Sequence, residues 1–177
     1  MFELKDLPSS DTLEAFSKRY HNPDIEGLRL WLQLAFSTEE MLSAFTANLA
    51  QHKLTQAKFF VLLLLLRNPN GLSIAALAQG VNVASPTMTR IIDRMEVAGL
   101  CKRVQDANDR RAWVVSIASK GDMIMSRAIP DHYAWVAVLM GHFDAAEREQ
   151  IYHLMTKLSR ATKAVSTREL QTAFKET

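Results

Sequence analysis

The chain has 177 residues, of which 48% are hydrophobic and 23% are charged. These values describe an ordinary globular protein and exclude a disordered or low-complexity chain. The net charge is only +2, but residues 1–54 carry a net −3, residues 55–120 a net +5, and residues 121–177 a net zero. A basic middle segment fits a surface that faces nucleic-acid phosphates, although a solvated basic face would give the same excess.

Cysteine content and hydropathy bound the location of the protein. The single cysteine, Cys101, excludes an internal disulfide framework and fits a reducing cytoplasm. The longest apolar run, residues 59–66, is far shorter than the ~20 residues that span a bilayer. The start of the chain lacks the basic and then apolar pattern of a secretory signal peptide. We therefore expect a cytoplasmic protein with no membrane segment.

The first half of the chain is predicted to be helical after a turn-rich start over residues 1–23. Ser10 is predicted to cap a short helix within that start. A long helix follows from Asp24 to about Gln51, on the order of 40 Å in length. One small domain cannot bury such a helix, so its outer part is expected to pack on a partner chain. Thr55 is predicted to cap the next helix, which ends at Arg67.

The next two helices have the pattern of a helix-turn-helix. Ser73 is a suitable cap for a short helix that is predicted to end at Gly80. A second helix starts at about Ser85, with Pro86 in its first turn, where a missing N–H does no harm. Its apolar residues recur at helical spacing and are expected to form one inward stripe: Met88, Ile91, Ile92 and Met95. In such a unit the second helix enters the DNA major groove.

The opposite side of this second helix is polar and basic. Hydroxyls bond phosphates or base edges, and an arginine reaches guanine with two hydrogen bonds. An ordinary solvated helix face is the alternative interpretation. The outward residues are Ser85, Thr87, Thr89, Arg90, Asp93 and Arg94.

A β-hairpin is predicted after this helix. Trp113, Val115 and Ile117 alternate with other side chains at the period of a half-buried strand. The tip, residues 106–111, is too polar to be buried. Its Arg110 and Arg111 can enter an adjacent minor groove, and Asp109 can hold the Arg111 guanidinium extended. The alternative is a charged hairpin loop with no DNA contact.

The last part of the chain is predicted to form two more helices. The first covers residues 119–141, and Pro130 is expected to kink it. Asp144 and Glu147 have the spacing of a capping box that begins the second. That helix shows apolar residues at core spacing: Ile151, Leu154, Met155, Leu158 and Val165.

No catalytic or cofactor-binding constellation is evident. The sequence lacks a glycine-rich phosphate loop and a nucleophile motif. His132, His142 and His153 are ten and eleven residues apart, which does not place them together on one helical face. We therefore expect a protein that is not an enzyme and that binds neither a metal nor a cofactor.

Several segments together resemble the MarR family of transcriptional regulators, over about residues 25–165. The most specific is the Asp-Arg-Arg tip followed by a strand and then Ser119-Lys-Gly121. The resemblance implies a mainly α fold with a small β-hairpin, in which a winged helix-turn-helix lobe joins a helical dimerisation lobe. The matching segments are residues 54–55, 75–80, 85–100 and 106–111. The expected division is an N-terminal extension and first dimerisation helix at 1–53, a DNA-binding lobe at 54–118, and C-terminal dimerisation helices at 119–177.

The same resemblance implies a function. We expect a sequence-specific regulator, by default a homodimeric repressor, bound to a pseudo-palindromic double-stranded operator. The resemblance places Ser85, Thr87, Thr89 and Arg90 in the major groove and Arg111 in the minor groove. A winged-helix protein-interaction module that does not bind DNA is the alternative. The full expected DNA-binding set is Ser85, Pro86, Thr87, Thr89, Arg90, Arg94, Asp109, Arg110 and Arg111.

Family members often release DNA when a small aromatic acid or phenol binds between the two lobes. In this chain the resemblance predicts that such a ligand binds among aromatic side chains of the long helix from Asp24 to about Gln51 and of the helix after it. One histidine would be its polar partner. The alternative is that these side chains are core residues. The set is Trp31, Phe36, Phe45, His52, Phe59 and Phe60.

Overall fold

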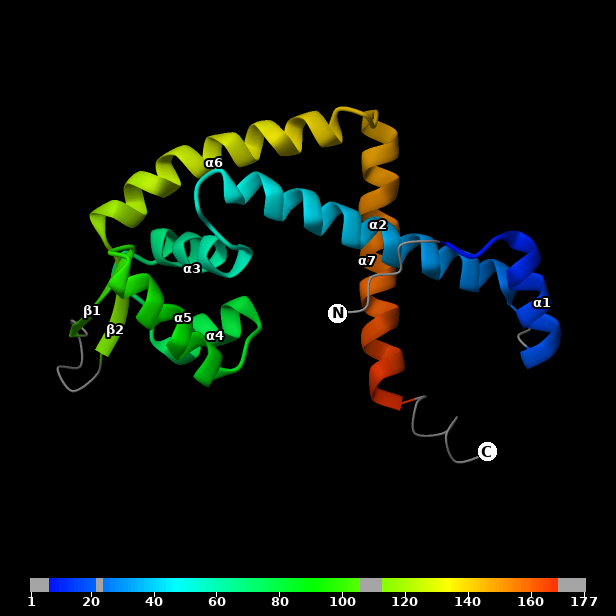
Figure 1. Cartoon of the computed structure of the whole chain (residues 1–177), viewed down its shortest axis with the longest axis horizontal. Coiled ribbons are helices and arrows are strands. Elements are labelled where there is room, and N and C mark those ends of the chain that lie inside the picture. Colours follow the sequence, from blue (N-terminus) through cyan, green and yellow to red (C-terminus); the bar gives the residue numbers. More distant parts are fainter. Residues whose placement is uncertain (1–6, 22–23, 106–112, 169–177) are drawn as a thin grey trace. The chain divides into compact units, whose positions relative to one another are not determined.

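The computed structural model describes residues 7–21, 24–105 and 113–168, which form seven helices and one antiparallel hairpin (Figure 1). The predicted fold class, mainly α with a small β-hairpin, is confirmed. The chain divides into two compact units, Met1–Pro130 and Asp131–Thr177, which are described separately here. The elements are α1 (Ser10–Tyr20), α2 (Ile25–Ala50), α3 (Gln56–Arg67), α4 (Ile74–Val81), α5 (Ser85–Val97), β1 (Cys101–Gln105), β2 (Trp113–Ile117), α6 (Ser119–Met140) and α7 (Ala145–Arg168).

The first two helices have the capping residues that polar side chains supply. Ser9, one residue before the predicted Ser10, caps α1 and accepts a hydrogen bond from a backbone N–H of the first turn. Asp24 caps α2 in the same way. Among the residues of α2, Phe45 and Leu49 are buried and most of the others are exposed. The long helix predicted here is thus present, and α1 packs against it.

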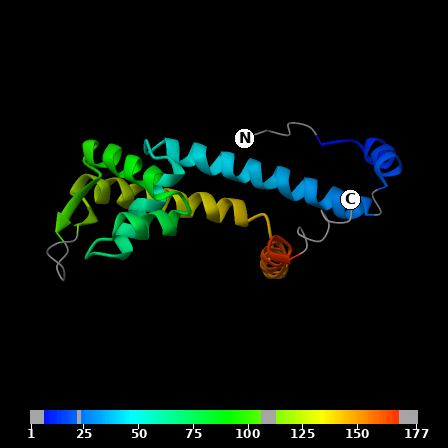
Figure 2. The same cartoon turned by 90° about the horizontal axis from the view of Figure 1, so that it is seen from below.

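Helices α3, α4 and α5 gather beside the hairpin, as the two views of Figures 1 and 2 show. Thr55 caps α3 as predicted, and its hydroxyl accepts from the Lys58 N–H at 3.3 Å. The core of the first unit is formed by these three helices, β2, the C-terminal end of α2 and the N-terminal part of α6. Its largest fully buried side chains are Leu49, Val61, Leu62, Leu65, Leu77, Met88, Ile92, Met95, Val115 and Met125.

The end of α4 differs from the prediction. Ser73 caps its start, as expected, but the helix continues past Gly80 and ends at Val81. Asn82 then adopts the left-handed conformation, with φ of 56°, which asparagine tolerates better than most residues. Gly80 has a packing role instead, because a Cβ atom there would lie 2.7 Å from a methyl carbon of Leu64 on α3.

The hairpin has a simple register. Cys101 pairs with Ile117, Arg103 with Val115 and Gln105 with Trp113. Outside the two strands, the backbone of Leu72 exchanges two hydrogen bonds with Val115, at 2.9 and 2.8 Å. This bridge fixes the middle of β2 to the segment between α3 and α4.

The second unit contains the C-terminal part of α6 and the whole of α7. The helix predicted for residues 119–141 is present as α6, Ser119–Met140, with Pro130 inside it. The kink expected at Pro130 stays a prediction. The capping box is confirmed, since the Asp144 N–H donates to the Glu147 carboxylate at 2.8 Å and the Glu147 N–H donates to Asp144 at 2.9 Å. Among residues 7–21, 24–105 and 113–168, no helix has the length and hydropathy that a membrane span requires.

The apolar stripe of α7 is partly exposed in the described part of the chain. Its predicted core residues, Ile151, Leu154, Met155, Leu158 and Val165, keep between 40% and 54% of their surface exposed. Helical spacing places these side chains on one face of the helix, but it does not specify whether the same chain supplies the surface that covers them.

Candidate nucleic-acid interface

Helix α5 has the two faces that its sequence predicts. Met88, Ile92 and Met95 are fully buried, and Ile91 beside them is partly covered. On the other side, five of the predicted contact residues are exposed and Thr89 is half-buried. The exposed five are Ser85, Pro86, Thr87, Arg90 and Arg94. Burial of the apolar stripe therefore holds the hydroxyl and guanidinium groups outward on one rigid helix.

The start of α5 is suited to an anion. The residue at the cap position is Ala84, which has no side-chain oxygen to accept a hydrogen bond from the first turn. Pro86 in that turn has no N–H. The remaining free backbone N–H groups and the positive end of the helix dipole favour a negatively charged partner, such as a phosphate.

The hydroxyl of Thr89 is already a hydrogen-bond donor within the helix. It donates to the Ser85 carbonyl oxygen, and the two oxygens lie 3.0 Å apart. A hydroxyl in this arrangement keeps its lone pairs and therefore serves an external group as an acceptor. A base-edge amino group fits that role better than a phosphate oxygen does.

Arg103 on β1 ties the hairpin to α5, a contact that the sequence analysis did not identify. Its guanidinium donates to the Asp93 carboxylate at 2.5 Å and also to the Glu96 carboxylate. Its backbone N–H donates to the second Glu96 oxygen at 3.0 Å. The hydrogen bond with Asp93 is the largest cause that raises the pKa of Arg103. The guanidinium therefore stays charged, and Asp93 is a structural partner on the otherwise open face.

The C-terminal end of α5 is fixed from three sides. Gly99 has φ of 73°, and the next N–H, that of Leu100, donates back to the Met95 carbonyl at 2.9 Å. Lys120 donates to the Ala98 carbonyl at 2.7 Å. A Cβ atom on Gly121 would lie 2.2 Å from the Leu100 carbonyl oxygen. The Ser119-Lys-Gly121 segment that carried the family resemblance thus holds the end of α5 in place.

Cys101 lies behind the hairpin and is chemically protected. It is buried, and its Sγ atom lies 3.9 Å from the Ile92 carbonyl oxygen. Burial, and then the nearby Glu96 carboxylate, raise the pKa of this thiol to about 11. The thiolate is the reactive form, so Cys101 is unsuited to a thiol switch near neutral pH.

Asp109, Arg110 and Arg111 lie outside the described residues, and their roles remain predictions. The last described pair before the tip is Gln105 and Trp113.

The structure brings together half of the predicted ligand-binding set. The rings of Phe45, Phe59 and Phe60 lie 5.7–5.8 Å apart, centroid to centroid. Phe45 and Phe59 are buried, as core residues would be, whereas Phe60 is exposed. Trp31 precedes Phe45 by fourteen residues of α2, which corresponds to roughly 21 Å along the helix. Trp31 is therefore separate from this cluster. Phe36 lies between Trp31 and Phe45 on α2, and His52 is half-buried just after the end of α2.

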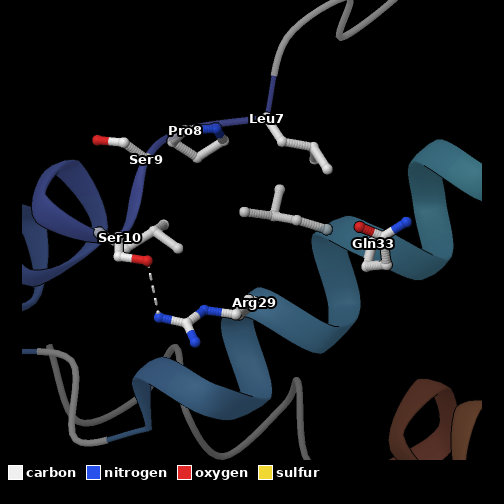
Figure 3. A pocket seen from close by; sticks show the side chains of 8 residues that line it. Leu7, Pro8, Ser9, Ser10, Arg29 and Gln33 are labelled. Carbon is white, nitrogen blue, oxygen red and sulfur yellow. Dashed lines mark hydrogen bonds between the residues drawn. The ribbon is translucent and has the colours of Figure 1, made fainter.

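A shallow pocket of about 280 Å³ lies elsewhere, between the start of α1 and the N-terminal half of α2 (Figure 3). The Arg29 guanidinium crosses its edge and donates to the Ser10 hydroxyl at 3.2 Å. Arg29 is also paired with Glu26 at 3.3 Å. None of the predicted ligand-binding residues lines this pocket, whose walls are Leu7, Pro8, Ser9, Ser10, Leu13, Arg29, Leu32 and Gln33.

Titratable side chains do not assemble into a metal site in the described part of the chain. No group of three or more His, Cys, Asp or Glu side chains has the required proximity there. His153 is instead paired with Glu149 at 2.9 Å, and the ring of His132 is stacked on that of Trp135.

Comparison with known sequences supports the family resemblance. Residues 54–113 match the MarR family. The HTH-type transcriptional repressor YetL of Bacillus subtilis is 25% identical over 157 residues, which cover 88% of this chain and 94% of YetL. The homoprotocatechuate degradative operon repressor of Escherichia coli is 26% identical over 126 residues, covering 71% of this chain and 84% of the repressor.

Solved structures confirm the fold. The MarR family transcription regulator SP03579 superposes with a TM-score of 0.70 at 18% identity, covering 83% of this chain and 99% of the regulator. MepR of S. aureus, in a DNA complex, gives a TM-score of 0.64 at 18% identity, covering 74% and 96%. PcaV of Streptomyces coelicolor, in complex with its natural ligand, gives 0.60 at 18% identity, covering 72% and 92%. The winged-helix arrangement expected from the sequence is therefore present.

Proposed function

We infer that this MarR-family chain is a DNA-binding transcriptional regulator, and we propose that it acts as a homodimeric repressor. The exposed face of α5 carries the proposal. This face combines hydroxyls at the helix start with two outward guanidinium groups. The buried apolar side chains on the opposite side of α5 fix its orientation. Relatives that bear the name of repressor, over most of their length, support the direction of regulation.

The exposed face of α5 is proposed to contact both the phosphate backbone and the base edges of the DNA. Phosphate contacts set the position of a protein on the duplex, and base-edge contacts carry sequence specificity. We assign the open start of α5 to a phosphate and the Arg90 and Thr89 side chains to base edges in the major groove. Arg94 and Pro86 flank them on the same helix. The wing-tip residues Asp109, Arg110 and Arg111 are proposed to reach the adjacent minor groove.

A second copy of the chain is proposed to cover the exposed apolar side chains of the helical elements. The apolar stripe of α7 is about half exposed, and α2 exposes Leu30, Trp31 and Met41. Exposed apolar surface of this extent is characteristic of an interaction site. A twofold dimer would present two α5 helices to major-groove half-sites about one helical turn apart, which requires a pseudo-palindromic operator.

Control by a small aromatic acid or phenol is the remaining part of the proposal. Ring contacts among Phe45, Phe59 and Phe60 offer an apolar partner for an aromatic ligand, and PcaV is a structural neighbour that was solved with its natural ligand. A ligand of this kind releases DNA only if it binds more tightly to a conformation that does not fit the operator. A thermal-shift screen of aromatic acids against native protein and Phe60→Ala would identify such a ligand.

An electrophoretic shift assay across a salt series tests the function itself. The DNA would be the region upstream of the protein's own gene, with an unrelated fragment of equal length as control. We expect binding to the upstream fragment that weakens steeply as salt rises, because phosphate contacts release counterions. Absence of a shift on either DNA at low salt would favour the alternative, a winged-helix module that binds another protein.

A further inference from the structure

Trp113 is exposed in an unexpected place. It begins β2 and keeps 60% of its surface exposed, although the next two residues, Val114 and Val115, are buried. Its partner across the hairpin is Gln105. A large apolar ring at the turn end of a short hairpin contributes little to the core. A binding partner can therefore cover it.

Strand geometry fixes the face on which Trp113 lies. Alternate residues of a strand share a face, and directly paired residues lie side by side on it. Trp113 and Gln105 therefore share the face of Arg103 and Cys101. That face is turned toward α5, because Cys101 contacts the Ile92 carbonyl and Arg103 binds two carboxylates of α5.

The position of the pair along the hairpin follows from the same register. From the base outward, the pairs on this face are Cys101 with Ile117, Arg103 with Val115, and Gln105 with Trp113. The last pair thus lies beyond the Arg103 contact, at the end of the hairpin farthest from its base. Figure 1 shows the two strands beside one end of α5 and running away from it.

We propose that Trp113 and Gln105 form a seat for one sugar–phosphate strand of the DNA. This proposal rests on the proposed function. A major groove and its neighbouring minor groove are separated by one backbone strand. A unit with α5 in the first groove and the wing tip in the second must straddle that strand, and the Gln105–Trp113 pair lies at the crossing.

The chemistry of the pair suits this partner. An indole ring has an apolar face that can pack on a deoxyribose and one N–H that can donate to a phosphate oxygen. The Gln105 amide adds further donors beside it. Both side chains are neutral, so the contact adds affinity on any sequence without adding a counterion-releasing charge.

Affinity measurements across a salt series separate this contact from its alternatives. We expect Trp113→Ala to weaken binding to operator and unrelated DNA alike, by about tenfold, and Trp113→Phe to weaken it less because only the donor is lost. The slope of log affinity against log salt is expected to stay unchanged, since that slope counts neutralised phosphates. Ser116→Ala, a neutral change on the opposite face of the same strand, is the matched control and is expected to bind like the native protein.

Two results would overturn the proposal. The first is native affinity in Trp113→Ala. The second is a shallower salt slope in that variant, because it would mean that the wing with its arginines has moved and that the loss is indirect. If the native protein itself binds no DNA at low salt, both the proposed function and the proposed contact of Trp113 and Gln105 with DNA are wrong.

Tryptophan fluorescence gives an independent test. Saturating operator DNA is expected to change the emission of native protein and of Trp31→Phe, and to leave the emission of Trp113→Phe unchanged. A DNA-dependent change in emission that survives in Trp113→Phe would contradict the assignment, whether it comes from Trp31 or from Trp135.

Discussion

Arg103 and Glu96 are joined twice, once through the backbone N–H of Arg103 and once through its guanidinium. The two residues lie on either side of the turn at Gly99, so the double contact fixes the direction in which the wing leaves α5. The same guanidinium binds Asp93 one helical turn earlier. The Arg103 side chain thus joins the hairpin to two successive turns of α5.

Removal of the Arg103 guanidinium should lower the free energy of unfolding. In Arg103→Gln, two carboxylates of α5 lose their cationic partner, and we expect the free energy of unfolding to fall by about 1–2 kcal/mol, since the pairs are partly exposed and screened. Arg103→Lys keeps the charge but not the fork of donors, so it should recover part of the loss. Urea unfolding measures both variants. Native stability in Arg103→Gln would show that the cluster contributes nothing to the fold.

Gly121 should not tolerate a side chain. Because a Cβ atom there would lie 2.2 Å from the Leu100 carbonyl oxygen, a Gly121→Ala change must displace backbone at the end of α5. We expect a loss of about 1–3 kcal/mol in the free energy of unfolding. Met123→Ala, an exposed position in the same turn of α6, is the control and should change stability by less than about 0.5 kcal/mol. Equal effects of the two changes would contradict the close contact.

Cys101 should be inert in the folded protein and reactive after unfolding. Its pKa is about 11 in the native chain, against an ordinary value of 9.0 for an unfolded thiol. The stability associated with the protonated thiol is therefore complete below pH 9 and is lost as the pH rises toward 11, because the unfolded chain ionises first. Thiol-reagent kinetics with and without urea, and the pH dependence of unfolding in native protein and Cys101→Ala, measure these effects. Rapid labelling of the native protein at pH 7 would refute the burial argument.

The apolar stripe of α7 is expected to lie in a dimer interface. Replacement of Leu154 and Leu158 by glutamate would place two charges in that interface, which is unfavourable when they are unpaired. We expect dissociation at protein concentrations at least about tenfold higher than for native protein, as measured by sedimentation equilibrium. Arg160→Glu adds a glutamate on the opposite face of the helix and should leave the dimer intact. A native protein that sediments as a monomer would remove the dimer from the proposal.

Local patterns predicted the elements and faces that depend on neighbouring residues. The spacing of Met88, Ile92 and Met95 predicted which side of α5 is buried, and the caps at Thr55 and Ser73 were identified from residue type alone. Such features are set within one or two helical turns. They do not depend on how distant segments are arranged.

Features that depend on distant segments were not predictable. Gly80 has the residue type of a helix stop, but α4 continues past it, and its close approach to Leu64 exists only because α3 and α4 pack together. The pairing of Arg103 with Glu96 requires the turn and the hairpin to bring the two together. The exposure of the α7 stripe depends on whether another surface covers it, and spacing within the helix carries no information about that.

The central claim is that the outward face of α5 contacts base edges in duplex DNA. The affinity of Arg90→Ala for operator DNA and for unrelated DNA, compared with native protein and with the charge-matched control Arg127→Ala on α6, tests it most directly. We expect Arg90→Ala to lose about 1–3 kcal/mol on operator DNA and less on unrelated DNA, and Arg127→Ala to show no such difference. Native affinity of Arg90→Ala for both DNAs would contradict the claim, and equal losses on both would reassign Arg90 to a phosphate contact.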